Sequence, residues 1–235
     1  MVSYKGSIIA LLAVLVLRVW DPWPIETIRL KYFDALLTAK EPVQSQSISI
    51  YNIDEDALAQ GGQWPWPRQQ LAELNRNFFE AGVGAVVYSA LFPEEDRFGG
   101  DAEFAASMLQ LPTFLSAVAT TETDRQEGWH IGVAPEVDGL VRRVPMIVRV
   151  GESLYPALGL DVLRGLAGDP SYQVRAGESG IQAVRVPSFD TVNTDSVGRV
   201  WIDWSTRFSQ EPLAGTIVFV GVTAAGVTTM VPSPQ

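Results

Sequence analysis

The sequence contains no cysteine and a single histidine, His130. The absence of cysteine excludes disulfide bonds, cysteine nucleophiles, thiolate zinc sites and iron–sulfur clusters, although it leaves the cellular compartment undecided. One histidine is too few for a histidine-rich metal centre, and a serine triad would need His130 as its base without any G-x-S-x-G motif. We therefore expect no metal site and no catalytic residues, and a structural role for His130.

Positively charged residues are also few. The 235 residues include 17 lysines and arginines against 27 aspartates and glutamates, which gives a formal charge of −10. A surface of that sign repels phosphate backbones, and no basic stripe offsets it, so we expect no binding of nucleic acid. Because 47% of the residues are hydrophobic and only 19% are charged, global disorder is excluded. The length suits one large domain.

The N-terminal apolar run falls short of the ~20 residues that span a bilayer. Residues 7–17 are eleven positions without a formal charge, and counting from Tyr4 to Trp23 gives twenty with aromatic residues at both ends. Lys5 favours a cytoplasmic amino terminus, and no small-x-small cleavage site follows. We interpret residues 1–23 as a transmembrane signal anchor and residues 24–235 as an extracytoplasmic domain at the cell membrane. A cleaved signal peptide and a buried core helix are the alternatives.

Strands and helices alternate along residues 47–119. After a helix over 25–37, we predict strands at 47–53, 84–88 and 113–119, separated by a helix from Gln69 and a helix over 101–110 with Asp101 as its N-cap. This alternation predicts an α/β domain in which a mostly parallel central sheet is flanked by helices in three layers.

The second half of the chain is richer in β-structure. We predict strands within 140–150, 172–176, 181–186, 190–194 and 199–204, and a helix over 155–166. The apolar segment 216–220 is expected at the centre of the sheet, where both faces are buried. No linker long enough to divide two domains is found.

Ligands of open parallel sheets bind at the carboxyl ends of the strands. There the sequence places the acidic segments 54–56 and 94–96 and the segment Trp64-Pro65-Trp66-Pro67-Arg68. Carboxylates could bind a cation or an amine, tryptophans could stack on a ligand, and Arg68 could bind an anion. The candidate ligand-binding residues are therefore Asp54, Trp64, Trp66, Arg68 and Asp101.

Each candidate also has a structural interpretation. Asp54 would cap a turn, the two tryptophans would plug the end of a core, and Arg68 would pair with Asp54 or Asp101. The segment 221–226 has the glycine spacing of a phosphate loop, but Val227 stands where its lysine is needed. We therefore expect no nucleotide cofactor.

Several motifs follow one another in the order of a known family. They are Ile53-Asp54-Glu55-Asp56-Ala57-Leu58, Gly62-x-Trp64-Pro65-Trp66-Pro67-Arg68, Leu91-Phe92 with Asp101 beyond, Val137-Asp138-Gly139-Leu140-Val141-Arg142-Arg143-Val144-Pro145, and Val220-Gly221-x-Thr223-Ala224-x-Gly226. Through these motifs residues 25–234 resemble the CHASE2 domain family, and the WPWPR segment is the most specific of them. The resemblance makes Asp138, Gly139, Arg142, Gly221, Thr223 and Gly226 residues of structural motifs.

The resemblance implies a non-catalytic, extracytoplasmic sensor domain of a bacterial receptor. Such domains bind an unidentified small-molecule or protein ligand and are joined through transmembrane helices to adenylate cyclase, diguanylate cyclase or kinase outputs, which this chain lacks. Because such outputs act as dimers, a homodimer is also implied. The alternative is a structural or interaction subunit of a membrane assembly that has lost ligand sensing.

Two positions depart from the family's pattern. Ser89 stands where an aspartate is usual, and Thr228 and Thr229 stand where an acidic residue is usual. The loss of two carboxylates counts against any cation site that they would complete.

Overall fold

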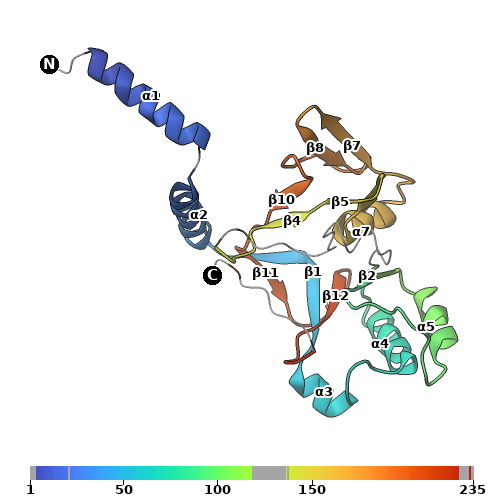
Figure 1. The fold of residues 1–235 in the computed structure, drawn as a ribbon. Helices are drawn as coiled ribbons and strands as arrows, with labels where there is room; N and C mark the ends of the chain where they lie inside the picture. The colour runs from blue at the N-terminus through green and yellow to red at the C-terminus, as the bar shows by residue number, and fades with distance from the viewer. Residues whose placement is uncertain (1–3, 21, 118–135, 137, 228–232, 234–235) are drawn as a thin grey trace.

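The computed structural model describes residues 4–20, 22–117, 136, 138–227 and 233. The helices are α1 (Tyr4–Trp20), α2 (Trp23–Thr38), α3 (Glu55–Gly61), α4 (Arg68–Glu80), α5 (Asp101–Met108) and α7 (Leu158–Ala167). The strands are β1 (Val43–Ile53), β2 (Ala85–Tyr88), β3 (Thr113–Leu115), β4 (Arg143–Pro145), β5 (Ile147–Val150), β6 (Ser153–Pro156), β7 (Gln173–Gly177), β8 (Gly180–Arg185), β9 (Val192–Asn193), β10 (Arg199–Trp201), β11 (Thr206–Ser209) and β12 (Ile217–Val222). Figure 1 shows α1 and α2 leading into a body whose centre is a sheet.

A five-stranded sheet in the order β11-β1-β12-β2-β3 forms that centre, and its pairings are parallel. β12 lies between β1 and β2, so that Val218 is opposite Ser49 on one side and Val86 on the other. No residue of β12 carries a charge, as a strand buried between two neighbours requires. The predicted α/β class with a mostly parallel central sheet is confirmed, and the apolar segment lies at the sheet's centre as expected.

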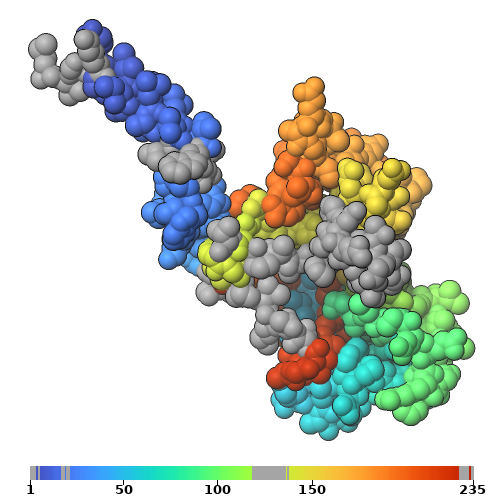
Figure 2. All heavy atoms as spheres, in the orientation of Figure 1, coloured from blue at the N-terminus to red at the C-terminus, as the bar shows by residue number. Residues whose placement is uncertain are grey.

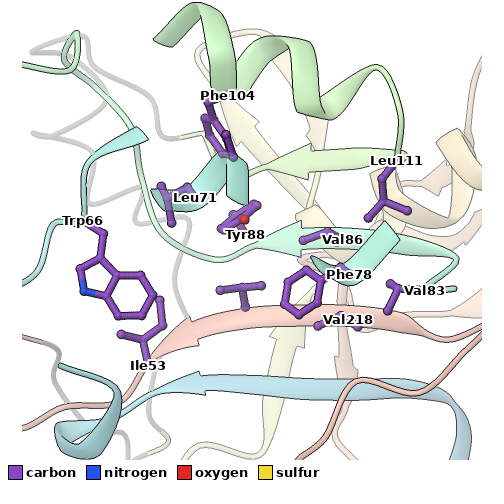
Figure 3. Packing of buried hydrophobic residues seen from close by; sticks show 12 residues of the cluster. Ile53, Trp66, Leu71, Phe78, Val83, Val86, Tyr88, Phe104, Leu111 and Val218 are labelled. Carbon is purple, nitrogen blue, oxygen red and sulfur yellow. The ribbon is translucent and has the colours of Figure 1, made fainter. Parts of the chain in front are cut away.

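Helices α4 and α5 cover one face of the sheet. Because α4 is amphipathic, it turns Leu71, Asn75 and Phe78 inward at helical spacing. Figure 3 shows Leu71 and Phe78 packed with Tyr88 of β2 and Val218 of β12 in the main apolar cluster. This cluster fixes α4, and with it the loop that precedes α4, against the sheet.

Helix α7 lies on the opposite face. Side chains alternate between the two faces of a strand, so Val87 of β2 points away from the cluster that holds Tyr88. Phe114 of β3 is in register with Val87 and so shares this second face. A Cβ at Gly165 of α7 would lie 2.5 Å from the Phe114 ring, which shows how closely α7 approaches β3. Helices therefore flank the sheet on both sides, as the three-layer prediction requires.

The second half of the chain adds small antiparallel units, β10-β4, β5-β6 and β7-β8-β9. They enclose a second apolar cluster around Ile147, Leu160 and Val184. The prediction of a more β-rich second half is confirmed, but residues 140–150 hold two strands rather than one. The helix predicted from residue 155 begins at Leu158, because Tyr155 and Pro156 pair with β5.

The N-terminal region differs from the predicted single spanning helix over residues 1–23. Helix α1 ends at Trp20 and α2 begins at Trp23, and the 17 residues of α1 extend about 26 Å at ~1.5 Å per residue, less than the ~30 Å hydrocarbon core. In the part of the chain that the structure describes, no helix is both long enough and apolar enough to cross a membrane. The predicted transmembrane helix is therefore corrected to two shorter helices, and Figure 2 shows the first of them, α1, standing out from the body.

Some expectations concern residues outside the described ranges. These are the structural role of His130, the end of the strand predicted to reach residue 119, and the positions Thr228 and Thr229.

Candidate functional site

The carboxyl ends of β1, β12 and β2 meet at one edge of the sheet, where the sequence placed the candidate site. The chain closes this edge with its own hydrogen bonds. Backbone N–H groups of Thr223 and Ala224 both donate to the carbonyl oxygen of Ile53, at 3.0 and 3.3 Å. Ser89 donates from Oγ to the carbonyl oxygen of Val220 at 3.0 Å. These contacts take up polar groups that a ligand in the crevice would otherwise meet.

The acidic segment after β1 is part of this closure. Asp54 is the N-cap of α3, with one carboxylate oxygen accepting from the backbone N–H of Ala57 at 2.9 Å. Glu55 accepts from the backbone N–H of Ala225 at 2.7 Å, and this hydrogen bond lowers the pKa of Glu55. Among the described residues, no three His, Cys, Asp or Glu side chains converge as metal ligands. Asp54 thus has the capping role that was its structural interpretation.

Arg68 holds the loop that leads to α5. Its guanidinium lies 4.3 Å from the ring centroid of Phe92, donates to the carbonyl oxygen of Glu94 at 3.3 Å, and pairs with Asp101 at 3.5 Å between Nε and Oδ1. The backbone N–H of Arg68 donates to Asp96 at 3.0 Å. Arg68 is thus a buried clamp that contacts Asp101 rather than Asp54 in the structure.

The prediction that Asp101 is the N-cap of the following helix is wrong. Gly100 occupies that position, and Asp101 is the first helical residue. Its carboxylate accepts instead from the backbone N–H of Asp96 at 2.7 Å, which closes the loop that precedes α5.

The two tryptophans differ in burial. Trp66 is only 5% exposed and belongs to the main cluster, where Figure 3 shows it beside Ile53. Its indole N–H donates to the carbonyl oxygen of Gly62 at 2.9 Å. Trp64 is half-buried and packs against the same cluster, with 6.2 Å between the two ring centroids. Both rings close the end of the core.

A pocket that the sequence did not predict lies beside Trp66, between α3, α4 and β1. Its volume is about 280 Å³. Tyr51 and Trp66 supply aromatic rings, Gln60, Gln70 and Asn77 supply amides, and Glu73 supplies a carboxylate. Of the five candidate residues, Trp66 is among those that line this pocket.

Local sequence explains how the pocket forms. Residues 70, 73, 74 and 77 lie on one side of α4, because helical neighbours are three and four positions apart. Gly61 allows α3 to approach closely, since a Cβ there would lie 2.6 Å from Nε2 of Gln70 and 2.7 Å from the Trp66 ring. Helix α3 was missing from the prediction, which placed no helix between the strand at 47–53 and the helix from Gln69, so the wall of the pocket that faces α4 was not foreseen.

A second constellation joins α2 to the body. Arg142 is fully buried and binds two aspartates. Its Nε and Nη2 donate to Asp34 of α2 at 2.7 and 2.6 Å, and its Nη1 and Nη2 donate to Asp138 at 2.8 and 2.7 Å. Both pairs are bidentate, the geometry in which arginine binds carboxylates most strongly. We call Asp34, Arg142 and Asp138 the Arg142 clamp.

The backbone turn at Gly139 allows Asp138 to contact Arg142. Gly139 has φ +85°, which only glycine adopts without strain, and its N–H donates to the carbonyl oxygen of Glu136 to close a turn. That turn brings Asp138 back onto Arg142. The hydrogen bonds from Arg142 lower the pKa of Asp138 to about 2, so the carboxylate is ionised at neutral pH.

Apolar and charged contacts reinforce the position of α2. Leu30 is 2% exposed, and the ring of Phe33 lies 4.5 Å from that of Trp201 in β10. At the end of the helix, Lys40 pairs with Asp203 at 2.8 Å. Helix α2 is therefore packed on the second half of the domain.

The remaining motif residues lie at the closed edge of the sheet. Gly221 is in β12, and a Cβ there would lie 3.3 Å from Oγ of Ser89, so the serine sits against the glycine. Thr223 donates to Ile53 as described above, and Gly226 has φ +81° in the turn that follows. These residues shape the backbone where β12 ends.

No curated protein and no solved structure shows significant similarity to the chain. The family model described as the CHASE2 domain matches residues 9–235, nearly the entire chain. The chain therefore belongs to the CHASE2 domain family.

Proposed function

We propose that this protein is the extracytoplasmic input domain of a membrane receptor, which binds a ligand without converting it and passes the signal on through α2. Membership of a family of extracellular sensor domains supports this proposal. The single observation that carries it is the Arg142 clamp, which ties the helix at the N-terminal end of the domain to the turn at residues 136–140.

The clamp suits signal transfer because its bidentate hydrogen bonds require one particular geometry of the guanidinium and the carboxylates. A buried arginine held by two bidentate carboxylates has one well-defined arrangement, and breaking either pair leaves a charge without its partner. A ligand that favours one arrangement of the domain would therefore shift the position of α2, provided that its affinity differs between the two arrangements. Apolar contacts alone would allow gradual displacement.

The experiment places residues 1–235 in front of the cyclase domain of a membrane-bound receptor and measures the production of cyclic nucleotide. We expect Asp34→Asn to change the basal output severalfold, because it weakens the contact between α2 and Arg142 without changing the size of the side chain. Lys31→Gln, at an exposed position of the same helix, is the matched control and should leave output unchanged. Equal outputs from all three proteins would contradict the proposed role of α2.

A further inference from the structure

The pocket between α3 and α4 has an unbalanced charge. Among the described residues that line it, Glu73 is the only charged one, and none is a lysine or an arginine. The two arginines of α4 pair elsewhere, Arg68 with Asp101 and Arg76 with Glu103. Glu73 is exposed and makes no ion pair within the described chain. The pocket therefore presents negative charge that the protein does not neutralise.

A second carboxylate lies near Tyr51, one of the residues that line the pocket. Burial, and to a lesser extent the negative charge of Asp54, raise the pKa of Tyr51, whose ring forms part of the wall. Tyr51 is therefore a neutral phenol at pH 7, and Asp54 lies close enough to act on it. With a formal charge of −10 on the whole chain, the long-range field has the same sign and concentrates cations near the surface.

The aromatic walls attract the same kind of ligand. The faces of tryptophan and tyrosine rings carry negative charge density, and they bind ammonium groups, including quaternary ones, by cation–π attraction. The indole N–H of Trp66 is already bonded to Gly62 and the residue is 5% exposed, so a ligand in the pocket would meet only the small exposed part of this ring, beside Tyr51. The amide side chains of Gln60, Gln70 and Asn77 make no hydrogen bond within the described chain, and their oxygens can accept from an N–H or O–H group.

These properties select among ligand classes. An anion would be repelled by Glu73 and would find no positive partner. A bare metal ion needs several oxygen ligands around one point, whereas two walls of the pocket are aromatic rings that supply none in that geometry. A small organic cation matches every feature of the pocket. Its charge is attracted by the carboxylate, its apolar groups pack against the aromatic residues, and its N–H or O–H groups donate to the amide oxygens. The volume of about 280 Å³ suits a small metabolite rather than a peptide.

We propose that the pocket formed by Tyr51, Gln60, Trp66, Gln70, Glu73 and Asn77 binds a small organic cation, an amine or a quaternary ammonium compound. This inference rests on the proposed sensor function and assigns a ligand class to it. The site lies beside the position where Trp66 closes the core, so a ligand in the pocket would contact the end of the main apolar cluster.

The test compares two molecules of the same shape. Choline and dimethylbutanol differ in that a quaternary nitrogen replaces a carbon, so only choline carries a charge. Binding of each to the full chain is measured by titration calorimetry at low ionic strength, with glucose and acetate as a neutral sugar and an anion. We expect choline to bind about tenfold more tightly than dimethylbutanol and its affinity to fall as salt is added.

Two charge-removing variants on the same helix locate the site. Glu73→Gln removes the pocket's carboxylate, and we expect it to weaken choline binding about threefold to fivefold, the range of an exposed ion pair. Glu80→Gln removes an exposed carboxylate outside the pocket, and the affinity should stay at the wild-type value. Equal losses in the two variants would show that choline senses only the overall charge and would overturn the assignment of the pocket.

The other outcomes are also decisive. Equal affinity for choline and dimethylbutanol, binding of glucose or acetate instead, or no binding of any probe would each overturn the cation proposal. Such results would leave the role of α2 untouched, because the cyclase assay of Asp34→Asn does not depend on the ligand. Conversely, tight and charge-dependent binding of choline together with an inert Asp34→Asn variant would support the pocket and contradict the proposed signalling route.

Discussion

The central sheet and the Arg142 clamp, which attaches α2 to the body, are held together by different physical forces. The main cluster around Phe78 and Tyr88 is apolar and packs from several directions at once. The Arg142 clamp depends on the guanidinium of Arg142, which is fully buried between two carboxylates. Apolar packing is non-directional and tolerates small shifts, whereas a buried ion pair is either formed or broken. The comparison shows that one domain combines a core held by apolar packing with a contact held by a single buried cation.

The largest expected effect comes from the core. Phe78→Ala removes a ring that is 3% exposed, and we expect a loss of about 3–5 kcal/mol in the free energy of unfolding from lost transfer energy and the cavity left behind. Denaturant unfolding measures the loss. The neighbouring residue Phe79 is 52% exposed, and Phe79→Ala is the matched control with a much smaller loss. Similar losses in the two variants would show that α4 is not packed as described.

An intermediate effect comes from the clamp. Arg142→Met keeps an unbranched side chain but leaves Asp34 and Asp138 without their partner, and we expect a loss of about 3 kcal/mol, since removing one member of a buried pair strands the other. Hydrogen exchange should speed up along α2 while the amides of β12 stay protected. The control is Arg149→Met at an exposed position of β5. Retained protection of α2 in Arg142→Met would remove the distinction between the two regions.

The smallest effect is a dependence on pH. The pKa of Asp138 is lowered to about 2 in the folded protein, mainly by its hydrogen bonds to Arg142, and is about 3.9 in the unfolded chain. A lowered pKa stabilises the fold above the unfolded value, so this contribution is complete above about pH 4 and is lost as the pH falls toward about 2. After solvent screening it is on the order of 1 kcal/mol.

Unfolding measured between about pH 5 and pH 2 checks this dependence. Wild-type protein should lose stability more steeply through that window than Asp138→Asn, which has no carboxylate to protonate. Identical slopes in the two proteins would mean that Asp138 is not held by Arg142 in solution.

Much of the sheet could be predicted from the sequence, because buried parallel strands are short apolar runs. The segments near residues 85 and 217 have this pattern, and both are central strands. Helix α3 escaped prediction because seven residues ending in Gly61 carry no clear apolar period. The start of β1 at Val43 was also missed, since residues 43–47 are polar or exposed, and within this stretch Val43 and Gln44 pair with the edge strand β11.

The site could be predicted only in part, because it depends on contacts between distant residues. Family resemblance singled out Asp138 and Arg142, but Asp34 is 108 residues away from Arg142 and gives no local signal. The pocket was missed because one of its walls is α3. The ligand-binding role of the candidates at the sheet edge stays a prediction, and the polar groups of Asp54, Arg68 and Asp101 have partners within the protein.

The place of β12 in the sheet has a consequence for how the protein folds. This strand is made last among those of the sheet, yet it lies between β1 and β2, and Ser49 hydrogen-bonds Thr216 across 167 residues of sequence. During synthesis the facing edges of β1 and β2 therefore stay unpaired until residues 217–222 have emerged. Such long-range pairing makes folding slow and leaves the nascent chain open to aggregation. The nascent domain is therefore most prone to aggregation just before β12, the strand at the centre of the sheet, is inserted.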